Sequence, residues 1–293
     1  PGRFHADDVF AVATLLLLLG AALPVFRRDP TVEEMDDPRV VVLDVGGRFD
    51  VRTSCYDHHQ RGFALERDPD EGYGIAGEAN NLAAFGLIWL EFPLHALDER
   101  VHQRVDAALV RGVDLLDANP AAARRGTGAS LSRAIYWLNP QDGQPEDYDA
   151  AFEVAVKFAT NVIGGATAEA EAFIKAEDIV RQARAEVSGT TLVLDKYVPW
   201  QEHIFGRGDQ SQLLYVVHPS DRGGYILQQV PKEPNGFEGR KPLPEEWAGL
   251  RGADIQRVTG VSDAMFTHVG RFVGGAASLD GTLAMAKLAV AHA

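Results

Sequence analysis

The feature that most constrains the fold is a run of four apolar residues, Val40 to Leu43, that ends in an acid and soon reaches two glycines. Three of the four side chains are valine, and the run is short, as is typical of a strand buried on both faces of a parallel sheet. Asp44 then stands at the carboxyl end of this strand, where the sites of α/β sheets lie. The stretch predicts an α/β domain with a functional edge at this point of the chain.

Helical patterns lie on both sides of this strand. Residues 7–23 combine two leading acids with a long apolar run, and further helices are expected near residues 80–92 and 95–117. The apolar part of the first run covers about 15 residues, fewer than the roughly 20 that cross a bilayer, so we interpret it as a buried helix. Helices that alternate with strands predict a mostly parallel sheet.

The second half of the chain follows a different pattern. A stretch rich in proline, glycine and alanine, residues 117–130, suggests an exposed connection. The elements expected after it are helices at 148–164 and 166–188, strands within 190–195, 211–219 and 223–231, and a helix at 278–292. We therefore predict three parts: an α/β domain at 1–125 with a mostly parallel sheet, a helical connector at 126–187 and a smaller α+β domain at 188–293.

Composition limits the class of protein. The formal net charge of −14 argues against broad binding of duplex nucleic acid by a basic face, but it still allows a nuclease with an acidic metal site. The single Cys55 cannot form an internal disulfide, and no secretory signal pattern begins the sequence. We expect a cytoplasmic, non-secreted protein that does not bind membranes. Its oligomeric state is left open, with a homo-oligomer among the options.

Acidic and imidazole side chains form four clusters in the first half of the chain, each where an apolar element meets a loop. The four clusters are His5, Asp7 and Asp8; Asp44; Asp57, His58 and His59; and Asp114 and Asp117. Carboxylates and imidazoles in this ratio suit Mn²⁺ or Mg²⁺. The simplest interpretation is a two-metal site, in which a carboxylate bridges the ions and a water molecule is activated for attack on phosphorus.

Taken singly, most of these clusters have an ordinary structural explanation. Asp7 and Asp8 suit the positive end of a helix dipole, and Asp44 could bond the following glycine turn. The adjacent His58 and His59 are harder to explain, because two imidazoles after an acid have little structural use in a loop. Together the four clusters favour the metal site.

The residues suggest distinct roles at such a site. The predicted ligands are His5, Asp7, Asp44 (a candidate bridge) and Asp57, with Asp8 as an alternate and Asp114 and Asp117 competing for the last position. His58 is either a ligand or a phosphate contact. His59 is the better candidate to bind the scissile phosphate or to protonate the leaving oxygen.

The C-terminal domain is expected to hold the part of the substrate remote from the metals. Gly274 and Gly275 precede a helix that Ser278 can cap, so a loop with free N–H groups there would bind an anion. His268 and Arg271 lie close by in the sequence and support this prediction. Arg61 is one of five basic candidates, with Arg27, Arg28, Arg240 and Lys241, most of which we expect to be solvated at the surface. We interpret Trp200, Trp247, Phe266 and Phe272 as core residues.

Several segments together resemble a known family. "FHADD", "VVVLDVGGRFD", "YDHHQRGF", "PWQEHIF", "LPEEWAGLR" and "RFVGGAASLDGTLAMAKLA" are similar to the melanocyte proliferating gene one exonuclease family, a branch of the DHH phosphoesterase superfamily. The resemblance runs over nearly the whole chain. It implies a metal-dependent phosphoesterase with 3′-to-5′ RNA exonuclease activity and with Mn²⁺ as the usual metal. It also implies that residues 1–125 form a DHH-type catalytic domain, with the active site in the cleft between this domain and the C-terminal one, and that the four clusters are the metal-binding motifs of the superfamily. With the two-metal interpretation above, we expect two Mn²⁺ ions, with Mg²⁺ as the alternative.

Three functions remain open at this point. The main hypothesis is a metal-dependent phosphodiesterase that acts on single-stranded RNA or short oligonucleotides. The first alternative is a phosphoesterase or pyrophosphatase with a small-molecule substrate. The second is a binding protein in which the metal is structural and no catalysis takes place.

Overall fold

Helix α8 (Pro145–Gln182) contains the boundary between the two units of the computed structural model, residues 1–171 and 172–293. The structure describes residues 2–20, 23–72, 81–93, 98–118, 130–234, 236 and 238–292. Two separate helices were predicted here, and this is wrong: α8 runs without a break through Gly164 and Gly165. A helix tolerates glycine at a cost of about 1 kcal/mol each, which packing elsewhere along the helix offsets. The three-part division of the chain stays a prediction.

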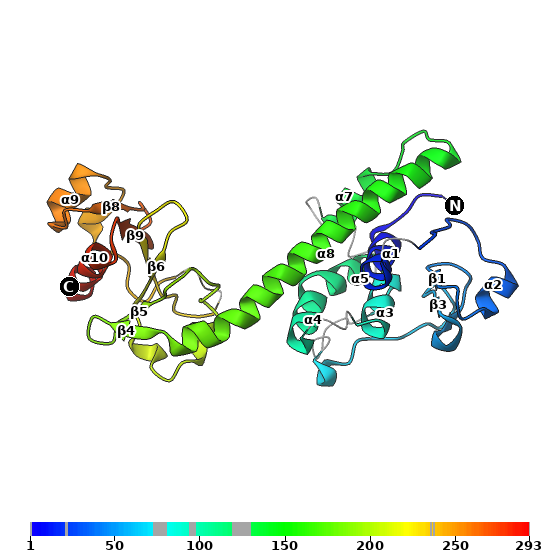
Figure 1. Cartoon of the computed structure of the whole chain (residues 1–293), viewed down its shortest axis with the longest axis horizontal. Helices are drawn as coiled ribbons and strands as arrows, with labels where there is room; N and C mark the ends of the chain where they lie inside the picture. Colours follow the sequence, from blue (N-terminus) through cyan, green and yellow to red (C-terminus); the bar gives the residue numbers. More distant parts are fainter. Residues whose placement is uncertain are drawn as a thin grey trace. The chain divides into compact units, whose positions relative to one another are not determined.

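Helices form most of the first unit (Figure 1). They are α1 (Ala6–Leu19), α2 (Val32–Asp36), α3 (Ala84–Glu91), α4 (Glu99–Val105), a π-helical turn (Asp106–Val110), α5 (Arg111–Ala118) and α7 (Leu131–Trp137). The helices expected near 7–23, 80–92 and 95–117 are therefore present, although residues 21–22, 80 and 95–97 lie outside the described residues. Most of the predicted connection at 117–130 also lies outside the described residues. Within the described ranges, no helix has the length and apolarity that a membrane crossing requires.

A small sheet accompanies these helices. Its strands are β1 (Val42–Leu43), β2 (Phe49–Asp50) and β3 (Cys55–Tyr56), in the order β1-β3-β2. β1 and β3 are parallel, but β2 and β3 are antiparallel, so the prediction of a mostly parallel sheet is wrong. The reason is the short connection at residues 51–54. A parallel pair needs a crossover of a dozen or more residues, whereas a connection this short closes an antiparallel hairpin.

The second unit is built on a six-stranded sheet in the order β4-β5-β6-β7-β9-β8. The strands are β4 (Arg184–Glu186), β5 (Thr191–Val193), β6 (Tyr215–Pro219), β7 (Tyr225–Gln229), β8 (Ala264–Thr267) and β9 (Val273–Ala276). Only β5 and β6 pair in parallel. The predicted strands within 190–195, 211–219 and 223–231 are confirmed as β5, β6 and β7.

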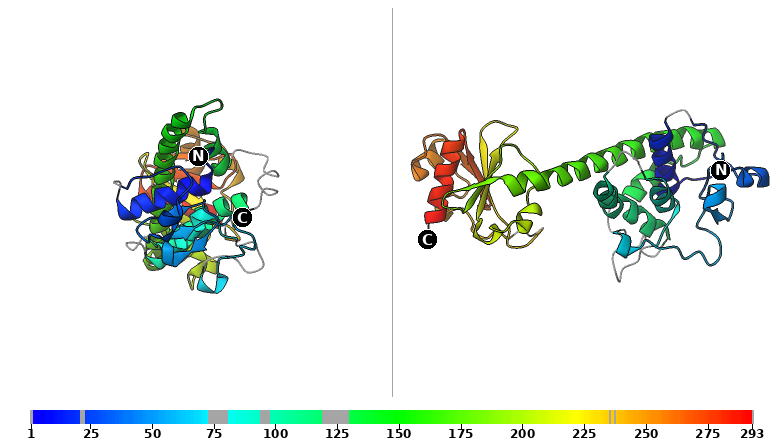
Figure 2. Two further views of the ribbon diagram at one scale, coloured as in Figure 1. Left: turned by 90° about the vertical axis from the view of Figure 1, so that its right-hand side faces the viewer. Right: turned by 60° about the horizontal axis from the view of Figure 1, so that its bottom comes forward.

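Alternate residues of β6 pack on opposite faces of this sheet. Val217 packs into a core with α9 (Ala253–Thr259) and α10 (Leu279–Ala291), whereas Val216 packs with the last turns of α8. This follows from the two-residue period of a strand. The predicted C-terminal helix is confirmed as α10, which lies against the sheet in Figure 2. Its first turn is capped by the Ser278 side chain, which accepts the Gly281 N–H.

The expected anion-binding loop at Gly274 and Gly275 is wrong in its geometry. Both glycines lie in β9, between β7 and β8, so their backbone is part of the sheet. A Cβ on Gly275 would lie 2.3 Å from the Tyr225 carbonyl oxygen, and one on Gly274 would lie 2.9 Å from that of Phe266. Glycine is therefore required here by the close approach of neighbouring strands.

A buried ion network holds the helices of the first unit together. The Arg67 Nε donates to both Asp106 oxygens at 2.8 and 3.0 Å, and its Nη2 donates to Asp114 Oδ2 at 2.6 Å. The side chains of all three are almost fully buried. Asp114 also accepts the Gly86 N–H at 3.0 Å, in a space so close that a Cβ on Gly86 would lie 1.9 Å from its carboxylate. The network thus ties α3, the π-helical turn and α5 to residue 67.

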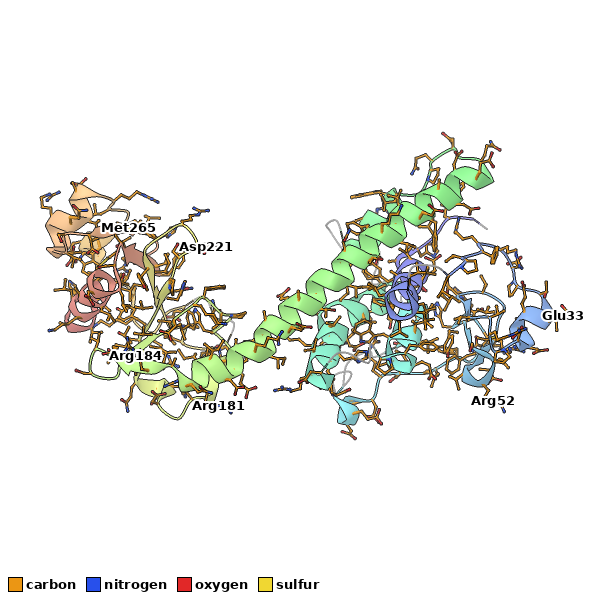
Figure 3. All side chains as sticks on the ribbon, in the orientation of Figure 1. Glu33, Arg52, Arg181, Arg184, Asp221 and Met265 are labelled. Carbon is orange, nitrogen blue, oxygen red and sulfur yellow. The ribbon has the colours of Figure 1, made fainter. Side chains whose placement is uncertain are left out.

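We predict that Arg67→Met lowers the free energy of unfolding by about 3–5 kcal/mol, because two carboxylates would remain buried without their cation. The matched control is Arg52→Met. Arg52 pairs with Asp50 at 3.0 Å but lies at the surface (Figure 3), so its loss should leave stability nearly unchanged. Urea denaturation followed by circular dichroism measures both. Equal effects of the two substitutions would contradict the structural role of the network.

Candidate metal centre

The parallel pairing of β1 and β3 brings two predicted motifs to one edge of the small sheet. Val42 pairs with Cys55 and Leu43 with Tyr56, so Asp44 and the Asp57–His59 triplet both follow carboxyl ends of neighbouring strands. Asp44 has a left-handed backbone, with φ 56°, and its N–H donates to the Tyr56 carbonyl oxygen at 3.0 Å. Asp tolerates this conformation better than most residues. The turn directs the chain away immediately after the acid.

Two helix ends complete the arrangement around the His58 ring. Asp7 lies in the first turn of α1 and Asp117 in the last turn of α5. The His58 Nε2 lies 3.2 Å from Asp117 Oδ2, 3.3 Å from Asp44 Oδ1 and 3.6 Å from Asp7 Oδ2. Three segments remote from one another in the sequence therefore place a carboxylate oxygen beside one imidazole nitrogen.

The potential ligand atoms fall into two adjoining groups. Asp44, His58 and His59 form one, and His5, Asp7 and Asp117 form the other; within each group the ligand atoms lie within 4.8 Å of one another. His58 touches both groups through its Nε2 contacts to Asp7 and Asp117. The sequence analysis named all six residues, and the structure brings all six together.

The chemistry of these groups fits divalent cations. Both carboxylate oxygens of Asp7, Oδ1 of Asp44 and Nε2 of His58 are buried without a hydrogen-bond partner. Buried polar atoms normally have one, since leaving them unpaired is costly. Neighbouring ligand atoms lie about 3 Å apart in octahedral coordination with bonds of about 2.1 Å, close to the separations around His58. The donor set of oxygen and imidazole suits Mn²⁺ or Mg²⁺.

The electrostatics of the cluster also favour the binding of a cation. Burial raises the pKa of Asp7 well above its ordinary value, and the nearby charges of Asp44 and Asp117 add to this shift. Burial and the charge of Asp44 raise the pKa of Asp8 to about 8. Burial alone would lower the pKa of His58, yet the carboxylates of Asp117, Asp44 and Asp7 raise it to about 12. The negative charges thus attract a proton or a cation to the centre.

Asp57 has a different environment from that of the six. Its Oδ2 accepts the Gly47 N–H at 2.6 Å, and its Oδ1 accepts the His59 N–H at 2.9 Å and contacts His59 Nδ1 at 2.9 Å. Burial opposes its ionisation, but the N–H groups of His59 and Gly47 lower the pKa of Asp57 below its ordinary value. Asp57 therefore joins the Gly47 turn to His59, and its predicted role as a ligand remains a prediction.

The two competing acids of α5 are placed differently. Asp117 belongs to the group with His5 and Asp7, whereas Asp114 lies in the buried network with Arg67 and belongs to neither group. Burial raises the pKa of Asp114 to about 7. The two residues are one helical turn apart, yet Asp114 bonds Arg67 whereas Asp117 contacts His58.

The other predicted site residues lie around or apart from the centre. Asp8 accepts the His5 N–H at 3.1 Å and so fixes the start of α1. His59, with 60% of its side chain exposed, and the exposed Arg61 lie on the solvent side. In the second unit, His268 accepts the Gly270 N–H at 3.0 Å, and Arg271 donates to the His268 carbonyl oxygen through its N–H at 2.9 Å. The predicted substrate contacts of these residues remain predictions.

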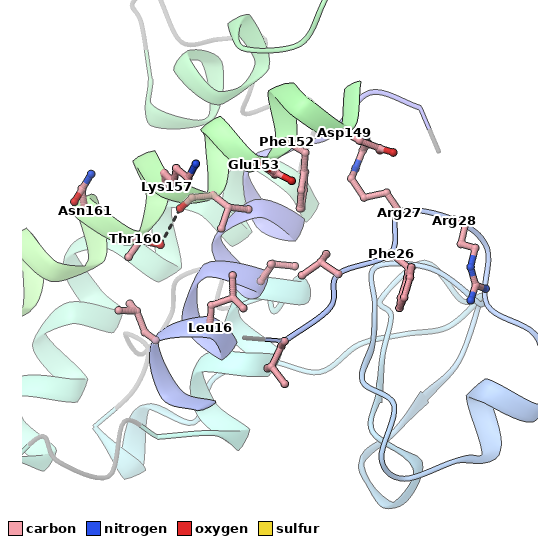
Figure 4. A pocket seen from close by; sticks show the side chains of 15 residues that line it. Leu16, Phe26, Arg27, Arg28, Asp149, Phe152, Glu153, Lys157, Thr160 and Asn161 are labelled. Carbon is pink, nitrogen blue, oxygen red and sulfur yellow. Dashed lines mark hydrogen bonds and ion pairs between the residues drawn. The ribbon is translucent and has the colours of Figure 1, made fainter. Parts of the chain in front are cut away.

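A pocket of about 1050 Å³ lies elsewhere in the first unit, between α1, residues 23–28 and α8 (Figure 4). Its lining from α1 consists of Val12, Leu16 and Leu17, and it includes none of the predicted metal ligands. The pocket is mostly apolar and is separate from the carboxylate cluster in its lining residues.

One residue that supports the centre was missed in the sequence. The buried Asn139 side chain accepts the Phe4 N–H and donates to the Phe4 carbonyl oxygen, both at 2.9 Å. This pairing fixes the backbone one residue before His5. Its partners are 135 positions apart, so no local pattern could have revealed the contact.

One protein family recurs among the known proteins that are similar to this chain. The family model MYG1_exonuc, described as an uncharacterised protein family (UPF0160), matches residues 1–290. The MYG1 exonuclease of Homo sapiens is 29% identical over 99% of this chain and 84% of its own length. The MYG1 proteins of Schizosaccharomyces pombe and Saccharomyces cerevisiae are each 28% identical over 99% of this chain, and over 95% and 94% of their own lengths. No solved structure matches the chain.

We predict that Mn²⁺ binding near pH 7 releases protons, because a cation and the protons held by Asp7, Asp8 and His58 compete for the same lone pairs. The cation-bound form holds fewer protons, so the affinity should rise with pH, by about tenfold per pH unit for each proton released. Calorimetric titrations in buffers of different ionisation enthalpy measure the proton count. Binding enthalpies that do not depend on the buffer would contradict this prediction.

Proposed function

The chain belongs to the MYG1 exonuclease family, and from this membership and the cluster around His58 we propose that it is a metal-dependent phosphodiesterase. The proposed substrates are single-stranded RNA and short oligonucleotides, digested from the 3′ end. The observation that carries the proposal is the convergence of three carboxylate oxygens on the buried His58 Nε2, at 3.2–3.6 Å. The name of the human relative, MYG1 exonuclease, supports the hydrolysis of nucleic acid.

Five residues of the two groups, His5, Asp7, Asp44, His58 and Asp117, would hold two divalent cations, with Mn²⁺ the first choice and Mg²⁺ the alternative. Bound at such a site, two cations would activate water and neutralise charge on the phosphoryl group. Asp44, the candidate bridge from the sequence, has its Oδ1 3.3 Å from His58 and 3.4 Å from His59 and would hold a cation beside His58. Asp7 forms the fully buried floor of the centre.

The proposed general acid of the site is His59, which Asp57 orients. Asp57 Oδ1 contacts the Nδ1 of His59 at 2.9 Å, and this contact suits the tautomer in which that nitrogen carries the proton. The carboxylate would stabilise the imidazolium and fix the plane of the ring. Because 60% of the His59 side chain is exposed, against 9% for His58, His59 can hydrogen-bond a phosphate oxygen or protonate the leaving oxygen.

Hydrolysis of a substrate panel tests the proposal. The purified chain should hydrolyse a chromogenic phosphodiester and single-stranded RNA in Mn²⁺, and a chelator should abolish both activities. Products from RNA labelled at its 5′ end should shorten one nucleotide at a time. Turnover of pyrophosphate or a nucleotide monoester alone would favour a small-molecule enzyme, and the absence of any turnover in Mn²⁺ would refute both enzymatic functions.

The two acids of α5 offer a matched pair of variants. Asp117→Asn should weaken Mn²⁺ binding and lower kcat/KM by about 100-fold or more, since it removes charge from a ligand position. Asp114→Asn should keep the Mn²⁺ affinity and alter mainly the stability, because Asp114 bonds Arg67 and Gly86. Calorimetry, steady-state kinetics and urea denaturation separate the effects. The reverse pattern would place Asp114, not Asp117, at the metals.

A further inference from the structure

Trp137 differs from the other tryptophans of the chain. The chain has four tryptophans, of which Trp89 and Trp200 are 0% exposed and Trp247 is 3% exposed, whereas Trp137 is 58% exposed. An exposed indole leaves a large apolar surface in water, which is costly unless a ligand covers it. Trp137 ends α7, so its position is set by a helix rather than by a loose loop.

Two arginines surround this end of α7. The Arg133 guanidinium lies 5.7 Å from the ring centre of Trp137 and 5.2 Å from that of Tyr136. Arg3 reaches the same tyrosine from the N-terminal segment, 5.3 Å from its ring centre, and also donates to its hydroxyl. Arg3, Arg133, Tyr136 and Trp137 together form a cation–aromatic cluster at the surface of the first unit.

The charge of this cluster is not neutralised within the described part of the chain. Neither Arg3 nor Arg133 has a carboxylate within ion-pair distance there, although acids outnumber bases in the chain by 42 to 28. Most other arginines of the first unit with a recorded partner bond a carboxylate, as Arg27 bonds Asp149 and Arg28 bonds Glu34. Two guanidiniums without a carboxylate partner among the described residues, beside an exposed indole, suit a ligand that carries both negative charge and flat rings.

The cluster is also tied to the metal centre. Asn139, two residues after Trp137, holds Phe4 by the two 2.9 Å hydrogen bonds described above. Arg3 precedes this anchor and His5 follows it. Two residues of extended chain span at most about 7 Å, so the Arg3 backbone lies within this distance of that of His5. A chain-like ligand could therefore reach the carboxylate cluster and the aromatic cluster together.

From these contacts we infer that the cluster of Arg3, Arg133, Tyr136 and Trp137 is a binding site for single-stranded nucleic acid, at which a base stacks on Trp137 and the arginines contact phosphates. The inference rests on the proposed function, which supplies the substrate class. Stacking on aromatic rings combined with cationic contacts is how proteins bind single strands without reading their sequence. The site would hold the nucleotides next to the scissile bond.

The chain offers a close control on the same unit. Phe26 is 71% exposed, and the Arg28 guanidinium lies 5.6 Å from its ring centre, so this pair resembles the Trp137 cluster in type. The Arg28 charge, however, is neutralised by Glu34 at 2.5 and 2.8 Å. Both residues line the pocket of Figure 4, whose other lining residues do not include the metal-centre side chains. Phe26→Ala and Arg28→Gln are therefore the matched controls.

Binding of a fluorescein-labelled single-stranded RNA, measured by anisotropy with the full chain in chelator, tests the inference. Trp137→Ala should raise Kd about 5- to 150-fold, the range that corresponds to the loss of one stacked base. Arg3→Gln and Arg133→Gln should each reduce the slope of log Kd against log salt by about 0.7. The two control variants should match the parent chain. In addition, RNA should protect the parent from acrylamide quenching, because Trp137 is the exposed indole.

An unchanged Kd for Trp137→Ala would overturn the inference, and so would RNA binding that leaves the quenching unaltered. A change in sedimentation coefficient with Trp137→Ala, without a change in RNA binding, would show that the cluster is a protein contact and would also overturn it. Hydrolysis assays distinguish this failure from that of the proposed function. The binding assay needs no turnover, so an inactive parent chain would refute the phosphodiesterase proposal and leave the binding test intact.

Discussion

The central constraint on the first unit is that several carboxylates must lie close together despite their mutual repulsion. Asp7, Asp44 and Asp117 place carboxylate oxygens 3.2–3.6 Å from one imidazole nitrogen, and burial, together with the repulsion by Asp44 and Asp117, raises the pKa of Asp7. Such an arrangement persists only if the surrounding structure fixes each backbone segment or a cation binds. The parallel pair β1 and β3, the start of α1 and the end of α5 fulfil the first condition.

Each of these segments has a buried polar contact of its own. Asn139 pairs with the backbone of Phe4 before α1, Asp57 holds the Gly47 turn after β1, and Arg67 holds α5 through Asp114. The supports are hydrogen-bonded groups rather than apolar side chains, and hydrogen bonds fix orientation more narrowly than hydrophobic contacts do. This explains how two-residue strands and the turns that follow them can position a cluster of charged side chains.

The sequence indicated which side chains lie close together better than it indicated the fold. Asp44 and His58 could be placed together because parallel strands end at one edge, and a valine run followed by an acid is a local pattern. The choice between Asp114 and Asp117 could not be made, since it depends on Arg67, 47 positions away from Asp114. Gly274 and Gly275 were taken for a loop because a glycine pair does not reveal the strands on either side. The exposure of Trp137 likewise depends on packing that no local pattern records.

Anomalous diffraction from crystals of the full chain grown with Mn²⁺ is the most direct test of the account. Data collected at the manganese absorption edge should show two peaks, one bounded by Asp44, His58 and His59 and the other by His5, Asp7 and Asp117. Peaks confined to other acidic side chains, or the absence of a peak at this cluster at saturating Mn²⁺, would contradict the account.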